Sequence, residues 1–179
     1  MTLEIVGGLM SGSLALLSDA GHMLGDFGAI SAAIIIAYLA FKNQKLDHKA
    51  RRAGAYIHGL LLLLSAAWVL IESIHRVNHP LEINIGPMIA FAAIGGLGNY
   101  CQHRILCASE KNITRTGMHW HIQTDLWQSV AIIAASLLIA ITGKTNIDLI
   151  VSVAIALVMA FGGLVMLVLG IQGQHQHKH

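Results

Sequence analysis

Long apolar runs separated by short polar segments make up most of this chain. A helix needs about 20 apolar residues to cross a bilayer. The runs that reach this length are 14–41, 53–74, 86–106, 116–141 and 149–171. Residues 1–10 are apolar apart from Thr2 and Glu4 but too few to span, and they are typical of the end of a helix whose first half is absent. The pattern predicts an all-α membrane protein, a six-helix transmembrane bundle with its first helix only partly present.

Ionisable residues interrupt two of these runs at a repeated spacing. Asp19, His22 and Asp26 are three and four residues apart in the second run, which places them on one face of a helix. His121 and Asp125 in the fifth run repeat the His-x-x-x-Asp spacing of His22 and Asp26. Ionisable groups in hydrocarbon are costly and usually face a protein interior or a water-filled path. This stripe and its counterpart are therefore the first candidates for function.

Composition and charge set the class of the protein and its expected orientation. With 55% hydrophobic and 11% charged residues and a mean hydropathy of +0.67, the chain is expected to be an integral membrane protein. A net charge of +2 is too small to indicate nucleic-acid binding. Nine of the eleven lysines and arginines lie in the predicted loop 42–52, in the segment 104–115 and in the tail. The positive-inside rule places these segments and the C-terminus in the cytoplasm, and we expect a multi-pass protein of the plasma (inner) membrane.

The two motifs are expected to reach similar depths. The second and fifth spans run in opposite directions, and a rise of about 1.5 Å per residue brings both pairs toward the middle of a core about 30 Å thick. Two imidazoles and two carboxylates suit tetrahedral Zn²⁺, with Cd²⁺ and Co²⁺ as further candidates. Without the metal, two protons would balance the two carboxylates. Because metal binding needs unprotonated histidine, this chemistry predicts exchange of metal for protons.

These motifs resemble the cation diffusion facilitator family, specifically its zinc-transporting branch. The stretch 11–26, SGSLALLSDAGHMLGD, looks like the family's second-helix signature, and 121–129, HIQTDLWQS, looks like its fifth-helix counterpart. The resemblance implies that His22, Asp26, His121 and Asp125 bind the transported ion, that the assembly is a homodimer, and that zinc leaves the cytoplasm as protons enter. Family members usually also have a complete first helix and a soluble C-terminal domain. This chain shows the end of that helix, and we expect a transmembrane domain at 1–171 with a short tail at 172–179.

The remaining polar residues receive structural interpretations. Asp19 is expected to line the exit path or cap the start of its helix. For Asn99, lining the cavity near the cytoplasmic end of its span is the less favoured interpretation. His58 and Glu72 are interpreted as bundle or interface residues rather than ligands. Either Asn146 or Asp148 is expected to cap the last helix. The glycines of the second run are expected to allow close helix packing; they are Gly21, Gly25 and Gly28. The tail histidines are expected to be solvated and to have no metal role; they are His175, His177 and His179.

Three other interpretations of the ionisable residues compete with a transport site. A His–Asp pair can be purely structural, as an interhelical hydrogen bond that stabilises the bundle by about 1 kcal/mol. A membrane-embedded zinc hydrolase is the alternative function, but four donors would close the open position that catalytic zinc needs, and the chain has no His-Glu-x-x-His motif. A purely structural subunit does not explain the cost of so many ionisable groups. We therefore expect a transporter and no enzyme, with Zn²⁺ as its substrate, no prosthetic group, and the lipid bilayer as its surroundings.

Overall fold

The computed structural model describes the backbone of residues 2–42, 47–108 and 113–172. Side chains in these ranges are described except at 29–30, 33, 36–37, 39–42, 47–55, 106, 108, 113–122 and 169–172. The tail histidines His175, His177 and His179 lie outside the described residues.

The described chain consists of six α-helices. They are α1 Thr2–Ser11, α2 Leu14–Lys42, α3 Asp47–Asn78, α4 Ile85–Ala108, α5 Ile113–Thr142 and α6 Asn146–Gln172. Segments long and apolar enough to cross a membrane, among the described residues, are Tyr56–Asn78, Gln123–Thr142 and Asn146–Val168. The predicted all-α membrane class and the order of six helices are confirmed.

Several helices extend beyond their apolar runs, so the predicted loops were too long. α3 begins at Asp47, within the stretch 42–52 that was expected to be a loop, and it continues to Asn78. α5 begins at Ile113, before the predicted run 116–141. Lysine, arginine and alanine are strong helix formers. Charged turns can therefore continue a helix past the point where the apolar pattern ends.

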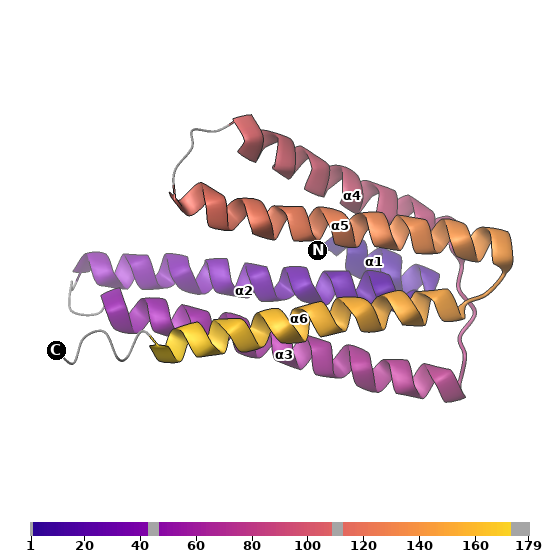
Figure 1. Cartoon of the computed structure of the whole chain (residues 1–179), viewed down its shortest axis with the longest axis horizontal. Helices are drawn as coiled ribbons and strands as arrows, with labels where there is room; N and C mark the ends of the chain where they lie inside the picture. The colour runs from indigo at the N-terminus through magenta and orange to yellow at the C-terminus, as the bar shows by residue number, and fades with distance from the viewer. Residues whose placement is uncertain (1, 43–46, 109–112, 173–179) are drawn as a thin grey trace.

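Glycines allow α3 to approach both of its neighbours closely. A Cβ added to Gly163 of α6 would lie 2.9 Å from the carbonyl oxygen of Gly59 in α3. On the other side of α3, a Cβ on Gly25 of α2 would lie 3.2 Å from the Leu62 side chain. Figure 1 shows α2, α3 and α6 together, with α4 and α5 paired beside them. The predicted packing role of the α2 glycine stripe is therefore confirmed at Gly25.

Among the side chains that the structure describes, the buried apolar residues gather in the half of the bundle where α2 begins and α5 ends. Those that are fully buried include Leu14 and Leu16 of α2, Met88 of α4, Ile139 of α5 and Met159 of α6. The opposite end contains the end of α2 and the beginning of α3 (Figure 1). His22 and Asp26 follow Leu14 and Leu16 along α2, toward the opposite end of the bundle.

The start of α2 is capped from another helix. Asp148 of α6 accepts hydrogen bonds from the Ser13 hydroxyl at 2.6 Å, the Leu14 amide at 2.7 Å and the Ala15 amide at 3.3 Å. The first amides of a helix lack partners within it, and this carboxylate supplies two acceptors. Of the two residues expected to cap α6, Asp148 does not do so, because its side chain reaches across to α2.

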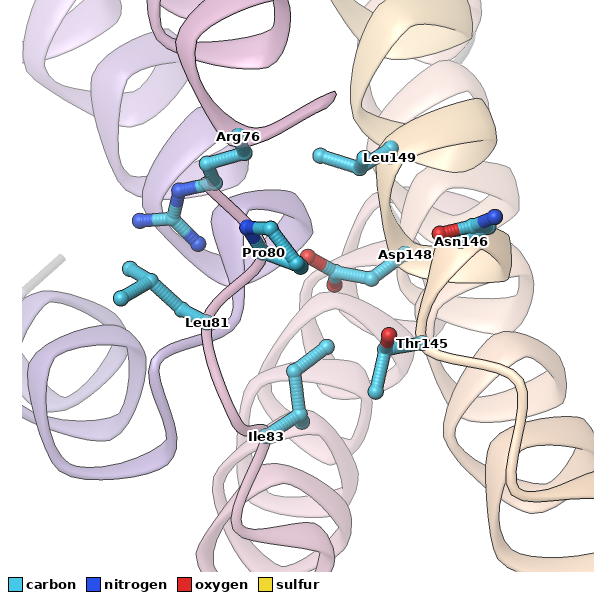
Figure 2. Close-up of a pocket in the computed structure, with 8 residues that line it drawn as sticks. All are labelled: Arg76, Pro80, Leu81, Ile83, Thr145, Asn146, Asp148 and Leu149. Atoms are coloured by element: carbon cyan, nitrogen blue, oxygen red, sulfur yellow. The ribbon is translucent and has the colours of Figure 1, made fainter. Parts of the chain in front are cut away.

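Arg76 of α3 reinforces the same corner. Its guanidinium donates to the carbonyl oxygen of Gly12 and to the Glu72 carboxylate, the latter over 2.8 Å from Nε to Oε1. Gly12 has a φ of 72°, a left-handed conformation that glycine adopts without strain. Figure 2 shows Arg76 and Asp148 lining a small surface pocket with Pro80 of the α3–α4 connection. The predicted bundle-stabilising role of Glu72 agrees with its bond to Arg76.

Candidate metal site

Three of the predicted ligands meet between α2 and α5. The Nε2 atom of His22 lies 3.1 Å from Oδ1 of Asp125 and 3.7 Å from Oδ2 of Asp26. One potential ligand atom from each residue lies within 4.8 Å of the other two. Two ligands at about 2.0–2.1 Å from a tetrahedral zinc lie roughly 3.3 Å apart. The separations of His22 from the two carboxylates lie on either side of this value, so the three donors are close enough together for one ion.

The helices position these donors through a short crossing. His22 and Asp26 lie one turn apart in α2, and Asp125 comes from α5, which contacts α2 over a short stretch only. Their side chains are 10%, 16% and 14% exposed, respectively. Interactions between charges are strong at such partly buried positions. The site is therefore largely enclosed without being sealed from its surroundings.

The fourth predicted ligand, His121, belongs to α5 one turn before Asp125. Its side chain lies outside the described residues, so its participation stays a prediction. The helical spacing places positions 121 and 125 on the same face of α5.

Asn99 of α4 forms hydrogen bonds to the turn of α5 that carries Asp125. Its amide nitrogen donates to the Ser129 hydroxyl over 2.8 Å and to the backbone carbonyl of Asp125 over 3.4 Å. Ser129 also donates to that carbonyl over 3.1 Å. These hydrogen bonds fix the turn of α5 that presents Asp125. Residues that orient ligands in this way commonly matter for metal affinity.

His58 of α3 lies closer to the site than the sequence indicated. Its Nε2 atom is 3.7 Å from Oδ1 of Asp26, and its Nδ1 atom is 3.2 Å from the carbonyl oxygen of Gly25. The sequence alone predicts that His58 is a bundle or interface residue, because periodicity within α3 carries no information on which face meets α2. Its nearness depends on the close packing of α2 and α3 at the glycine stripe.

Two further polar residues flank the cluster on the side of the apolar core. Asp19 is 3% exposed and is not one of the three clustered residues. Of the two roles expected for Asp19, the cap at the start of α2 is supplied by Asp148 instead, and the place along an exit path stays a prediction. Gln128 was overlooked by the sequence analysis, although it follows Asp125 by three residues on the same face. It is buried, and among the described residues neither of its amide atoms has a hydrogen-bond partner.

Comparison with known proteins gives a consistent assignment. The cation efflux transmembrane domain family matches residues 1–172. The zinc transporter ZitB of Pectobacterium atrosepticum is 36% identical over 163 residues, which are 87% of this chain and 51% of that protein. ZitB of Escherichia coli is 33% identical, with coverage of 89% and 53%.

A third relative carries a broader name. The cadmium, cobalt and zinc/H(+)-K(+) antiporter of Bacillus velezensis is 31% identical over 91% of this chain and 55% of its own length. The chain thus spans about half the length of these curated relatives, all of which are named as transporters rather than enzymes. The resemblance noted from the two His-x-x-x-Asp motifs is confirmed, and the chain belongs to the cation diffusion facilitator family, with relatives in its zinc-transporting branch.

Proposed function

We propose that this protein exports Zn²⁺ from the cytoplasm in exchange for protons, through an intramembrane site made by His22, Asp26, His121 and Asp125. The observation that carries the proposal is the meeting of His22, Asp26 and Asp125 between two helices far apart in the sequence. A bundle needs no such convergence of ionisable groups, which are costly in a membrane. Binding of a cation that is carried across the membrane would explain why these ionisable groups are present.

The donor set favours zinc among the divalent cations. Nitrogen and carboxylate oxygen donors in a four-coordinate arrangement suit Zn²⁺, and they also accept Co²⁺ and Cd²⁺. The names of the relatives include zinc in each case and cadmium and cobalt in one. We therefore propose Zn²⁺ as the principal substrate, with Cd²⁺ and Co²⁺ as further candidates.

Charge balance supports exchange for protons. Asp26 and Asp125 together neutralise a divalent cation, so its departure leaves two negative charges in a largely enclosed position. Protons taken up by the histidines restore the balance, and a returning metal ion must displace them. A proton moves in the opposite direction to zinc whenever the site changes sides. The name of the Bacillus relative includes H(+) exchange, which is in accord with this scheme.

The surroundings of the site are also part of the proposal. The end of the bundle with the end of α2 and the beginning of α3 faces the cytoplasm, because most lysines and arginines lie in the segments at that end. The C-terminal tail from 172 then follows on the cytoplasmic side of a transmembrane domain at 1–171. We propose that the protein acts as a homodimer in the inner membrane.

Proteoliposomes that contain the full-length protein test this function. Vesicles with an acidic interior should accumulate external Zn²⁺, and a protonophore should stop the accumulation. His22→Ala and Asp125→Ala should each abolish uptake, because each removes a donor from the cluster. Glu82→Ala, which removes an exposed carboxylate in the α3–α4 connection, is the matched control and should transport normally. Uptake that persists unchanged in both site variants would contradict the proposed site.

A further inference from the structure

The histidine of α3 that faces Asp26 has the arrangement of a metal ligand. The Nδ1 atom of His58 is 3.2 Å from the carbonyl oxygen of Gly25. A carbonyl oxygen only accepts hydrogen bonds, so Nδ1 carries the hydrogen in this contact. Histidines that bind metals usually donate their other ring N–H to a backbone carbonyl or a carboxylate in the same way. In neutral His58, this leaves Nε2 as the nitrogen with a lone pair, directed toward Asp26.

The separation between His58 and Asp26 suits a shared ion. Nε2 of His58 is 3.7 Å from Oδ1 of Asp26, the same separation as between His22 Nε2 and the other oxygen of Asp26. Two ligands of one tetrahedral zinc are expected about 3.3 Å apart. Asp26 therefore lies between two imidazoles, with one carboxylate oxygen toward each. The His58 side chain is 12% exposed, comparable to the other members of the site.

His58 lies toward the end of the bundle where α3 begins. It is two residues inside the apolar segment Tyr56–Asn78 and contacts the turn of α2 at Gly25 and Asp26, four residues beyond His22 toward the end of α2. In the proposed orientation this is the cytoplasmic end. A cation that arrives from the cytoplasm would meet His58 and Asp26 before it meets His22 and Asp125.

We propose that His58 contacts the transported cation and holds it, together with Asp26, at a loading position one step before the site formed by His22, Asp26 and Asp125. This inference rests on the proposed transport function and adds a fifth residue to its ligands. Asp26 passes the ion from one of its oxygens to the other, so the cation is not released between the two positions. His58 thus helps to select cations that accept nitrogen donors.

A cysteine placed at position 58 tests direct contact. The experiment uses the full-length protein in lipid nanodiscs, with Cys101→Ser and Cys107→Ser to remove the two exposed cysteines, and Co²⁺ as the probe. A thiolate bound to Co²⁺ produces an intense near-ultraviolet charge-transfer band. His58→Cys should show this band on addition of Co²⁺. Leu60→Cys, on an exposed face of the same helix, is the matched control and should not.

Zinc affinity provides a second and independent measurement. His58→Ala should weaken Zn²⁺ binding by roughly tenfold or more, a loss typical of a residue that contributes to a metal site. This measurement also covers the case in which the cysteine variant fails to fold. A residue that only packs against α2 would leave the affinity within about twofold of the wild type and would give no band.

The outcomes separate this inference from the proposed function. If His58→Cys gives no band beyond that of Leu60→Cys, or if His58→Ala binds zinc as the wild type does, His58 is not a contact of the cation and the inference is overturned. In that case, loss of Zn²⁺ binding in Asp26→Asn would still support the transport site. If Asp26→Asn also binds zinc normally, both the inference and the proposed site are contradicted.

Discussion

The buried carboxylate of Asp148 and the partly buried pair Asp26 and Asp125 have different surroundings in this bundle. At the corner near the start of α2, Asp148 accepts three hydrogen bonds, two from backbone amides and one from the Ser13 hydroxyl. Between α2 and α5, Asp26 and Asp125 face imidazole nitrogens of His22 and His58 at 3.1–3.7 Å. The first carboxylate is surrounded by fixed donors. The other two are accompanied by groups that bind either a proton or a metal.

The difference teaches how a structural carboxylate can be distinguished from a functional one within a membrane domain. Backbone amides cannot change their protonation, so Asp148 has one stable arrangement and fastens α6 to α2. Histidines exchange their protons near neutral pH. A carboxylate beside them can be balanced by protons at one moment and by a divalent cation at another. Asp148 is also fully buried, whereas Asp26 and Asp125 are only partly buried, so the carboxylates with the exchangeable partners are the more accessible ones.

Removal of one carboxylate of each kind is expected to give the largest effects on stability and on zinc affinity. Asp148→Asn turns an acceptor toward the Leu14 amide into a donor or leaves the amide without its partner, and we expect a loss of about 1–3 kcal/mol of stability. The thermal unfolding midpoint in detergent should fall by about 2–4 °C per kcal/mol. Zn²⁺ affinity, measured by titration below that midpoint, should stay close to that of the wild type.

Asp125→Asn is the matched control and should show the reverse pattern. It should lose more affinity than the roughly 10–100-fold that removal of a supporting residue costs. The unfolding midpoint of the metal-free protein should stay the same or rise, because an ionised carboxylate is costly inside a membrane bundle. Equal losses of stability and of zinc affinity in both variants would break the distinction between the two kinds of carboxylate.

A smaller effect is expected from the hydrogen bonds that hold Asp125. Asn99→Leu removes the amide that donates to Ser129 and to the Asp125 carbonyl, so the ligand should be less well oriented. We expect zinc affinity to fall by about tenfold, as measured by competition with a chelating dye. Asn78→Ala, at an exposed asparagine that bonds to Ile74 of its own helix α3, should have no effect. An unchanged affinity in Asn99→Leu would show that Asp125 needs no support from α4.

The parts of the site that could be predicted from sequence are those governed by one helix at a time. A spacing of four residues places His22 and Asp26 on one face of α2, independently of the rest of the fold. The same spacing at 121–125 indicates the second half of the site. The helix count follows from the length of the apolar runs. These inferences need only the rise and period of an α-helix.

The parts that escaped prediction depend on how two helices meet. His58 reaches Asp26 because α3 packs closely on the glycine face of α2, which fixes a register that neither helix encodes alone. Asp148 caps α2 because the start of α6 lies beside it, and a local reading assigned the cap to α6 itself. Helix ends were displaced because charged residues such as those at 47–52 continue α3 where the apolar signal stops.

The most direct test of zinc–proton exchange is the number of protons released when the full-length protein binds Zn²⁺. Calorimetric titrations in buffers with different heats of ionisation give that number. If Asp26 and Asp125 balance either protons on the histidines or the metal, zinc should release about two protons near neutral pH, and His22→Ala should release fewer as well as bind more weakly. Tight zinc binding without proton release, or a release unaffected by His22→Ala, would contradict the exchange.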